Sequence, residues 1–201
     1  IPYVPSTTSG LVATLKGPHS SDHIIGIRAD IDALPIKEET GAPYASEKEG
    51  TMHACGHDTH ITILLGTAKV LAAMKDELTV TVRFLFQPAE EEIANSGATY
   101  MKDEPLVKEC ERLIALHIWS KIPVGTASLR YGPVMSAADT FDVYIEGKGG
   151  HGALPHQTID PIVAGAEFVN ALQTVVSREV NPLEPAVLSV TTFQAGTTSN
   201  V

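Results

Sequence analysis

The chain has 201 residues, of which 43% are hydrophobic and 19% are charged, and this length and composition are typical of a globular protein with one or two domains. They exclude a disordered tail, a collagen-like repeat and a disulfide-stapled miniprotein. The 14 basic and 24 acidic residues give a net charge of −10, which argues against nucleic acids and membrane surfaces as partners because both are negatively charged.

The first 118 residues alternate between strand and helix patterns. Three segments rich in apolar or β-branched residues predict strands, at 24–31, 79–86 and 113–118. A helical apolar stripe predicts a helix over 59–76, for which Asp58 or Thr59 is a plausible N-cap, and a short helix is expected over 92–102. Strands and helices in alternation indicate an α/β fold with a mostly parallel sheet.

The pattern changes after Pro133. Residues 140–146 alternate strictly between apolar and polar side chains, which predicts a strand with one face in water. A helix is expected to begin at Asp160-Pro161, with the aspartate as N-cap, and residues 186–193 predict a further strand. We therefore expect a boundary near Met135, between an α/β domain over 1–135 and part of a small α+β domain over 136–201.

Polar residues of the kinds that bind metals follow the three predicted strands of the first domain and precede its long helix. They are Asp30, Asp32, Cys55, His57, Glu90, Glu91 and His117. Since ligands bind at the carboxyl ends of the strands in open α/β sheets, these side chains are expected to meet in one crevice. The alternative for any one acidic residue is a solvated turn, but the set as a whole favours a metal site.

The segment around Cys55 and His57 has the donors of a zinc site. A thiolate and an imidazole two residues apart suit zinc and its neighbours better than calcium or magnesium. A structural four-ligand zinc site is the weaker interpretation because there is no second cysteine pair. We expect Asp58 to anchor a ligand histidine, and His53 and His60 to be supporting or surface groups. Cys110 has no companion and is expected to be inert.

The adjacent carboxylates of Glu90 and Glu91 suit hydrolysis. If the chain is extended there, the two side chains point to opposite sides, so that one can bind metal while the other faces water. A free carboxylate beside a metal can take a proton from water and pass it to a leaving amine. The alternative is an acidic first turn of a helix. His151, which lies between glycines, has the pattern of a turn residue.

Five motifs together resemble the aminoacylase/carboxypeptidase family of metallohydrolases, and in particular its amidohydrolase branch, which includes hippurate and plant auxin-conjugate hydrolases. They are RADIDALP at 28–35, MHACGHD at 52–58, QPAEE at 87–91, LHIW at 116–119 and GKGGHGALPH at 147–156. The resemblance runs from about Leu11 to Val201. It implies a catalytic domain of which 1–135 is the N-terminal part, followed by part of a lid and dimerisation domain.

The resemblance also implies the roles of individual residues. Two divalent metal ions are expected, with Cys55, His57, Glu91 and His117 as ligands; zinc is the first choice, and manganese, cobalt and nickel are alternatives. Glu90 is implied as the general base that activates a water bridging the metals, and Asp32 as a residue that orients a ligand or tunes the site. His151 would stabilise the oxyanion, often in the partner subunit of a homodimer, and Asn200 would contact the substrate.

The implied function is a metal-dependent amidohydrolase or peptidase that cleaves N-acyl amino acids, amino-acid conjugates or short peptides. Relatives continue beyond the lid and supply a last metal-binding histidine, so the chain is expected to be an incomplete view of a longer enzyme. The alternative is a truncated or degenerate relative that binds metal or peptide without catalysis. A zinc deaminase is disfavoured because its Pro-Cys-x-x-Cys pair is absent. With two cysteines and no apolar run long enough to span a bilayer, a cytoplasmic location is expected.

Overall fold

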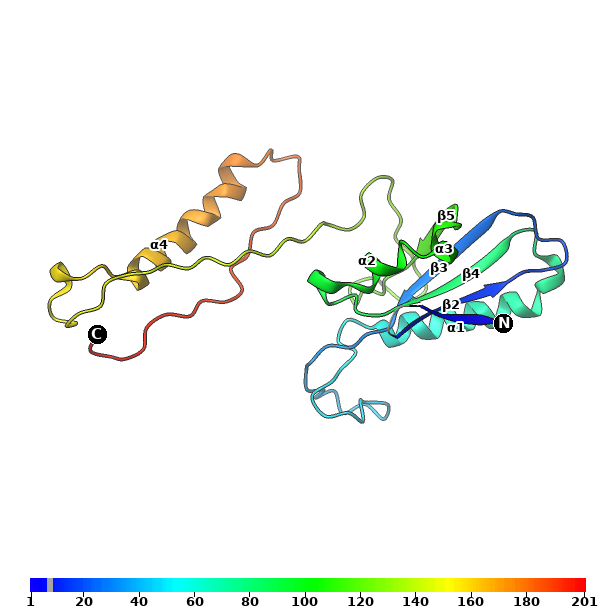
Figure 1. The fold of residues 1–201 in the computed structure, drawn as a ribbon, viewed down its shortest axis with the longest axis horizontal. Helices are drawn as coiled ribbons and strands as arrows, with labels where there is room; N and C mark the ends of the chain where they lie inside the picture. Colours follow the sequence, from blue (N-terminus) through cyan, green and yellow to red (C-terminus); the bar gives the residue numbers. More distant parts are fainter. Residues whose placement is uncertain (7–8) are drawn as a thin grey trace. The chain divides into compact units, whose positions relative to one another are not determined.

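The computed structural model describes residues 1–6 and 9–201, and the chain separates into two compact units, Ile1–Ala138 and Asp139–Val201. The first unit contains a five-stranded sheet and most of the helices, and the second contains one long helix (Figure 1). No helix among the described residues is both long enough and apolar enough to cross a membrane.

The sheet has the strand order β1-β2-β4-β3-β5. Its strands are β1 (Tyr3–Ser6), β2 (Gly10–Leu15), β3 (Ile24–Asp30), β4 (Thr81–Gln87) and β5 (Arg112–Ala115). β3 pairs in parallel with β4 and β5, whereas β2 pairs antiparallel with β1 and β4. The α/β prediction is confirmed, but the sheet is mixed rather than mostly parallel, because an N-terminal hairpin that the sequence analysis did not predict adds the two antiparallel pairings.

Helices cover both faces of the sheet, and β4 is buried along its whole length between them. Alternate β4 residues point to opposite faces: Phe84, which is fully buried, packs with Leu64 of α1 (His57–Ala73), and Leu85 packs with Met101 of α2 (Gly97–Met101). The short α3 (Pro105–Lys108) adds apolar side chains to the second face. α1 connects β3 to the parallel β4, as the strand–helix–strand pattern predicts.

Several predicted elements differ in their boundaries. The helix expected over 59–76 begins at His57, and its N-cap is Gly56 rather than Asp58 or Thr59; a 3-10 turn, η1 (Lys75–Glu77), follows it. The helix expected over 92–102 is divided into a 3-10 turn, η2 (Ile93–Asn95), and α2, with the non-helical Ser96 between them. The strand expected over 113–118 ends at Ala115.

The second unit contains α4 (Pro161–Thr174), followed by the π-helical turn η4 (Val175–Glu179), and a short 3-10 turn η3 (Pro155–Gln157) precedes it. The predicted helix start is confirmed: Asp160 caps α4 by accepting hydrogen bonds from two backbone N–H groups, and Pro161 is its first residue. Residues 140–146 and 186–193 form no strand ladder, and the one bridge in the described part of this unit joins Lys148 to Ile159. A strand needs a hydrogen-bonded neighbour, so the local sequence pattern of these segments was not enough to predict a strand.

Candidate metal centre

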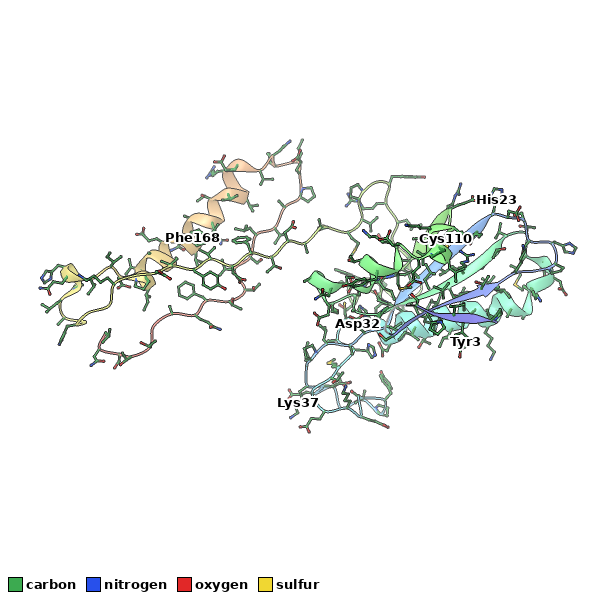
Figure 2. All side chains as sticks on the ribbon, in the orientation of Figure 1. Tyr3, His23, Asp32, Lys37, Cys110 and Phe168 are labelled. Carbon is green, nitrogen blue, oxygen red and sulfur yellow. The ribbon has the colours of Figure 1, made fainter. Side chains whose placement is uncertain are left out.

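The parallel strands β4, β3 and β5 end at the same edge of the sheet, and α1 begins there. Asp32 follows β3, Glu90 and Glu91 follow β4, and His117 follows β5, while His57 is the first residue of α1. Figure 2 shows Asp32 where the chain leaves the sheet after β3. The structure therefore brings these side chains, with Cys55, to one place at the carboxyl ends of the strands.

Two local features return the chain to this edge after an exposed loop. Leu34 and Met52 exchange backbone hydrogen bonds of 2.9 and 3.0 Å and so close the base of the loop between them. Gly56 then adopts a left-handed conformation with φ of 87°, and a Cβ at this position would lie 2.4 Å from Ile118 Cδ1. Glycine is required here for both reasons, and the sharp turn allows Cys55 and His57 to face the same space.

His57 lies at the centre of the site, and only 1% of its side chain is exposed. Its Nδ1 is 3.0 Å from the Asp32 carbonyl oxygen and 3.2 Å from Asp32 Oδ1. Both atoms are acceptors, so Nδ1 carries the proton and donates it, and the lone pair resides on Nε2. Nε2 is buried without a hydrogen-bond partner and lies 3.8 Å from both Glu90 Oε2 and Glu91 Oε1.

The two glutamates approach the same imidazole nitrogen. The opposite orientation of the two side chains required an extended chain, and this condition is not met because the chain is bent at this point. The bend follows Ala89, whose φ of 51° is rare for a residue other than glycine, and strained backbone of this kind is concentrated at functional sites. Asp32 Oδ2 accepts a hydrogen bond of 2.9 Å from the Glu91 backbone N–H, which links this bend to β3.

The two carboxylates differ in their surroundings. The Glu91 side chain is 27% exposed, and its Oε1 is buried without a partner. The Glu90 side chain is 40% exposed and therefore faces solvent more. This difference suits a division in which the inner carboxylate binds a cation and the outer one exchanges protons with water.

Cys55 Sγ lies 3.3 Å from His117 Nε2, and His117 Nδ1 is turned to the carbonyl oxygen of Ile118. Burial raises the pKa of the Cys55 thiol to about 11, and the nearby carboxylates of Glu91, Glu90 and Asp30 contribute. The thiol is therefore neutral in the absence of a cation. Bound metal reverses this preference, since a coordinating thiol loses its proton.

These residues fit divalent metal ions. Ligand atoms of Cys55, His57 and His117 all lie within 4.8 Å of one another, as do those of His57, Glu90 and Glu91. A cation between the two sets would give a partner to both orphaned atoms, His57 Nε2 and Glu91 Oε1. Sulfur and imidazole donors favour zinc, and the carboxylates also suit manganese.

Asp30 and His60 are more closely involved in the candidate metal centre than the sequence indicated. Asp30 and His60 are fully buried, and His60 Nδ1 lies 2.6 Å from Asp30 Oδ1. Burial acts to raise the pKa of Asp30, but the hydrogen bond from His60 and the charges of Arg28 and His57 together hold it below its ordinary value. His60 lies three residues after His57 on α1, and this helical spacing was the signal that places both on one face.

Other predicted supporting residues lie elsewhere. Asp58 is exposed in the first turn of α1, and Asp32 rather than Asp58 holds a histidine of the site. His53 is partly buried, and its Nδ1 has no hydrogen-bond partner. Cys110 packs beneath β3, where its thiol contacts the Leu106 carbonyl group at 3.5 Å.

His151 and Asn200 belong to the second unit. The backbone N–H of Ala153 donates to His151 Nδ1 at 3.1 Å, which leaves the ring proton on the exposed Nε2. The backbone carbonyl group of Asn200 accepts a hydrogen bond of 3.0 Å from the Gly152 N–H, so the glycine-rich turn and the 198–201 segment lie together.

Comparisons with known proteins match residues 26–200 to the model for peptidase family M20/M25/M40. The chain is 49% identical over 195 residues to the N-acyl-L-amino acid amidohydrolase of Geobacillus stearothermophilus, covering 97% of this chain and 52% of that protein. It is 46% identical over 198 residues to an N-acetylcysteine deacetylase of Bacillus subtilis, covering 98% of this chain and 51% of that protein.

Among solved structures, the chain resembles the YXEP protein of Bacillus subtilis, described as a dinuclear metal-binding peptidase of the M20 family. The TM-score is 0.65 at 36% identity, covering 86% of this chain and 46% of that one. The chain thus spans about half the length of the relatives it matches. The resemblance to the amidohydrolase branch that the motifs indicated is confirmed.

Proposed function

The chain belongs to peptidase family M20/M25/M40, and on this basis we propose that it forms the metal centre of an amidohydrolase acting on N-acyl amino acids, amino-acid conjugates or short peptides. One observation carries the proposal: the buried and unpaired Nε2 of His57 lies 3.8 Å from a carboxylate oxygen of each of two adjacent glutamates. The substrate class is taken from two relatives, whose names describe an N-acyl-L-amino acid amidohydrolase and an N-acetylcysteine deacetylase.

The ligands of two divalent metal ions would be Cys55, His57, Glu91 and His117. Zinc is the first choice because of the thiolate, and manganese, cobalt and nickel are alternatives. When bound, the ions supply Lewis-acid chemistry, which lowers the pKa of water and polarises the amide carbonyl group. Asp32 keeps the Nε2 lone pair of His57 free for this purpose by accepting a hydrogen bond from the Nδ1–H group.

Glu90 would act as general base and then as general acid. Its carboxylate takes a proton from the attacking water as the oxygen bonds to the amide carbon. It gives this proton to the amine nitrogen as the carbon–nitrogen bond breaks, so the side chain returns to its starting state. The greater exposure of Glu90 compared with Glu91 supports this role, since the group must reach both water and substrate.

His151 and Asn200 are proposed as substrate-facing residues of a lid and dimerisation domain that begins in the second unit. His151 can donate from Nε2, because its Nδ1 already accepts a hydrogen bond, and a donor of this kind can stabilise the oxyanion of the tetrahedral intermediate. Asn200, which lies near the same turn, would contact the substrate. A homodimer assembled through this domain is part of the proposal.

The test is Glu90→Gln in the complete protein, with N-acetyl, N-benzoyl and dipeptide substrates. We expect an unchanged metal content and a kcat reduced by about 10²–10⁴-fold, which is the usual contribution of a general base. Glu92→Gln is the matched control, because Glu92 is an exposed acid two positions away. Unchanged turnover in Glu90→Gln would refute the role of Glu90, and bound metal without hydrolysis in the wild type would favour the non-catalytic alternative.

A further inference from the structure

The buried Asp30–His60 pair connects β3, α1 and the segment after β5. His60 Nδ1 lies 2.6 Å from Asp30 Oδ1, and the Ile118 backbone N–H donates to His60 Nε2 at 3.0 Å. Ile118 directly follows His117, and its side chain lies against Gly56, between Cys55 and His57. The His60 ring also lies edge-on to the His117 ring, with centroids 4.7 Å apart.

From these contacts we infer that His60, held by Asp30, is a positioning residue that sets the placement of His117 in the metal centre. This inference rests on the proposed function, in which His117 is a metal ligand. His60 acts through the backbone of Ile118 rather than by binding a cation or substrate itself.

The hydrogen bonds determine which ring nitrogen carries the proton in both histidines. His60 accepts at Nε2, so its proton is on Nδ1 and points to Asp30. His117 Nδ1 faces the Ile118 carbonyl oxygen, so its proton is also on Nδ1 and its Nε2 lone pair faces Cys55 Sγ. His60 bonds to the Ile118 N–H and His117 bonds to the Ile118 carbonyl group, so the placement of Ile118 by His60 decides where the His117 lone pair points.

The same bonds remove His60 from the set of ligands. Asp30, His57 and His60 could hold a cation on distance alone, since their ligand atoms lie within 4.8 Å of one another. Both ring nitrogens of His60 are already used, however, and no lone pair is left for a metal.

Arg28 keeps the carboxylate of Asp30 oriented for this role. Its Nη1 donates to Asp30 Oδ2 at 2.8 Å, and its Nε donates to Gln87 Oε1 at 2.9 Å. The Asp30 carboxylate therefore has a separate partner for each oxygen, and Oδ1 stays directed at His60.

The experiment compares His60→Leu, which removes both hydrogen bonds, with His60→Gln, whose amide can donate to Asp30 and accept from Ile118. Cobalt(II) titrations of the complete protein give the Kd, and the sulfur-to-cobalt absorption band reports the bond to Cys55. We expect the Kd to rise about 10–100-fold in His60→Leu, the usual effect of removing a residue that orients a ligand. His60→Gln should recover most of that loss.

The control variant Leu64→Ala distinguishes the positioning effect of His60 from a general loss of stability. It removes a buried core side chain one turn further along α1. It should lower the Tm without changing cobalt affinity. Equal losses of affinity in His60→Leu and Leu64→Ala, or no rescue by His60→Gln, would overturn the inference.

Nitrogen NMR shifts of His117 in the metal-free protein provide a second readout. We expect a proton on Nδ1 in the wild type and a mixture of tautomers in His60→Leu. A wild type that binds no cobalt would refute the proposed metal centre, and the tautomer of His117 would still decide the positioning role. An unchanged tautomer in His60→Leu would refute that role.

Discussion

The thiol of Cys55 predicts a specific pH dependence of metal affinity. Burial and the surrounding carboxylates raise its pKa to about 11, so the sulfur carries a proton throughout the neutral range. A metal ion that binds through this sulfur must displace that proton. Affinity should therefore rise with pH, and it should keep rising until the pH approaches the thiol pKa.

The size of the effect follows from one proton. Each unit of pH lowers the proton activity tenfold, so the displaced thiol proton alone makes the Kd fall about tenfold per unit, or about 10³-fold between pH 7 and pH 10. Cys55→Ala loses this contribution. Its log Kd should fall with pH less steeply than that of the wild type, by one unit of slope, and protons lost from the remaining ligands cancel in the comparison.

The measurement is isothermal titration calorimetry with zinc in buffers of different ionisation enthalpy, which counts the protons released on binding. At pH 8 the wild type should release about one proton more than Cys55→Ala. Cys110→Ser is the control, because Cys110 packs beneath β3 and should not change the count. Equal proton release by the wild type and Cys55→Ala would show that the thiol is not a ligand.

Two further predictions concern the contact between Gly97 and Pro88 near the site and the N-cap of α4 in the second unit. In Gly97→Ala, the new Cβ would lie 2.1 Å from the Pro88 carbonyl oxygen, so the segment that carries Glu90 must move and the amide hydrolysis proposed for the complete protein should fall. In the control Gly66→Ala, no atom lies within 4 Å of the new Cβ, and the substitution should instead raise the free energy of unfolding by up to about 1 kcal/mol. Wild-type activity in Gly97→Ala would show that this contact is dispensable. Asp160→Ala removes the acceptor for two N–H groups at the start of α4 and should lower the free energy of unfolding, measured with urea, by about 1 kcal/mol. Asp160→Asn should lower it less, because a side-chain oxygen remains. Equal losses in the two variants would contradict the capping role.

Much of the first unit was predictable because its patterns are local. The nearly continuous apolar run of β3 and the apolar stripe of α1 indicate which segments pack into the core, and in the second unit the Asp160-Pro161 start of α4 depends on neighbouring residues alone. The strand expected over 140–146 did not form a ladder, since pairing depends on a partner segment that the local pattern does not contain. The pairing of β2 with β4 depends on the tertiary structure in the same way.

For the candidate site, the sequence by itself determined the residue types and their positions at strand ends, from which a metal centre and its family could be inferred. Only the tertiary structure decided that Asp32 rather than Asp58 holds His57, that the bend at Ala89 turns both glutamates to one nitrogen, and that His60 is bonded at both ring nitrogens. The physical reason is that proton positions and thiol ionisation depend on atoms within a few ångströms, which come from segments far apart in the chain.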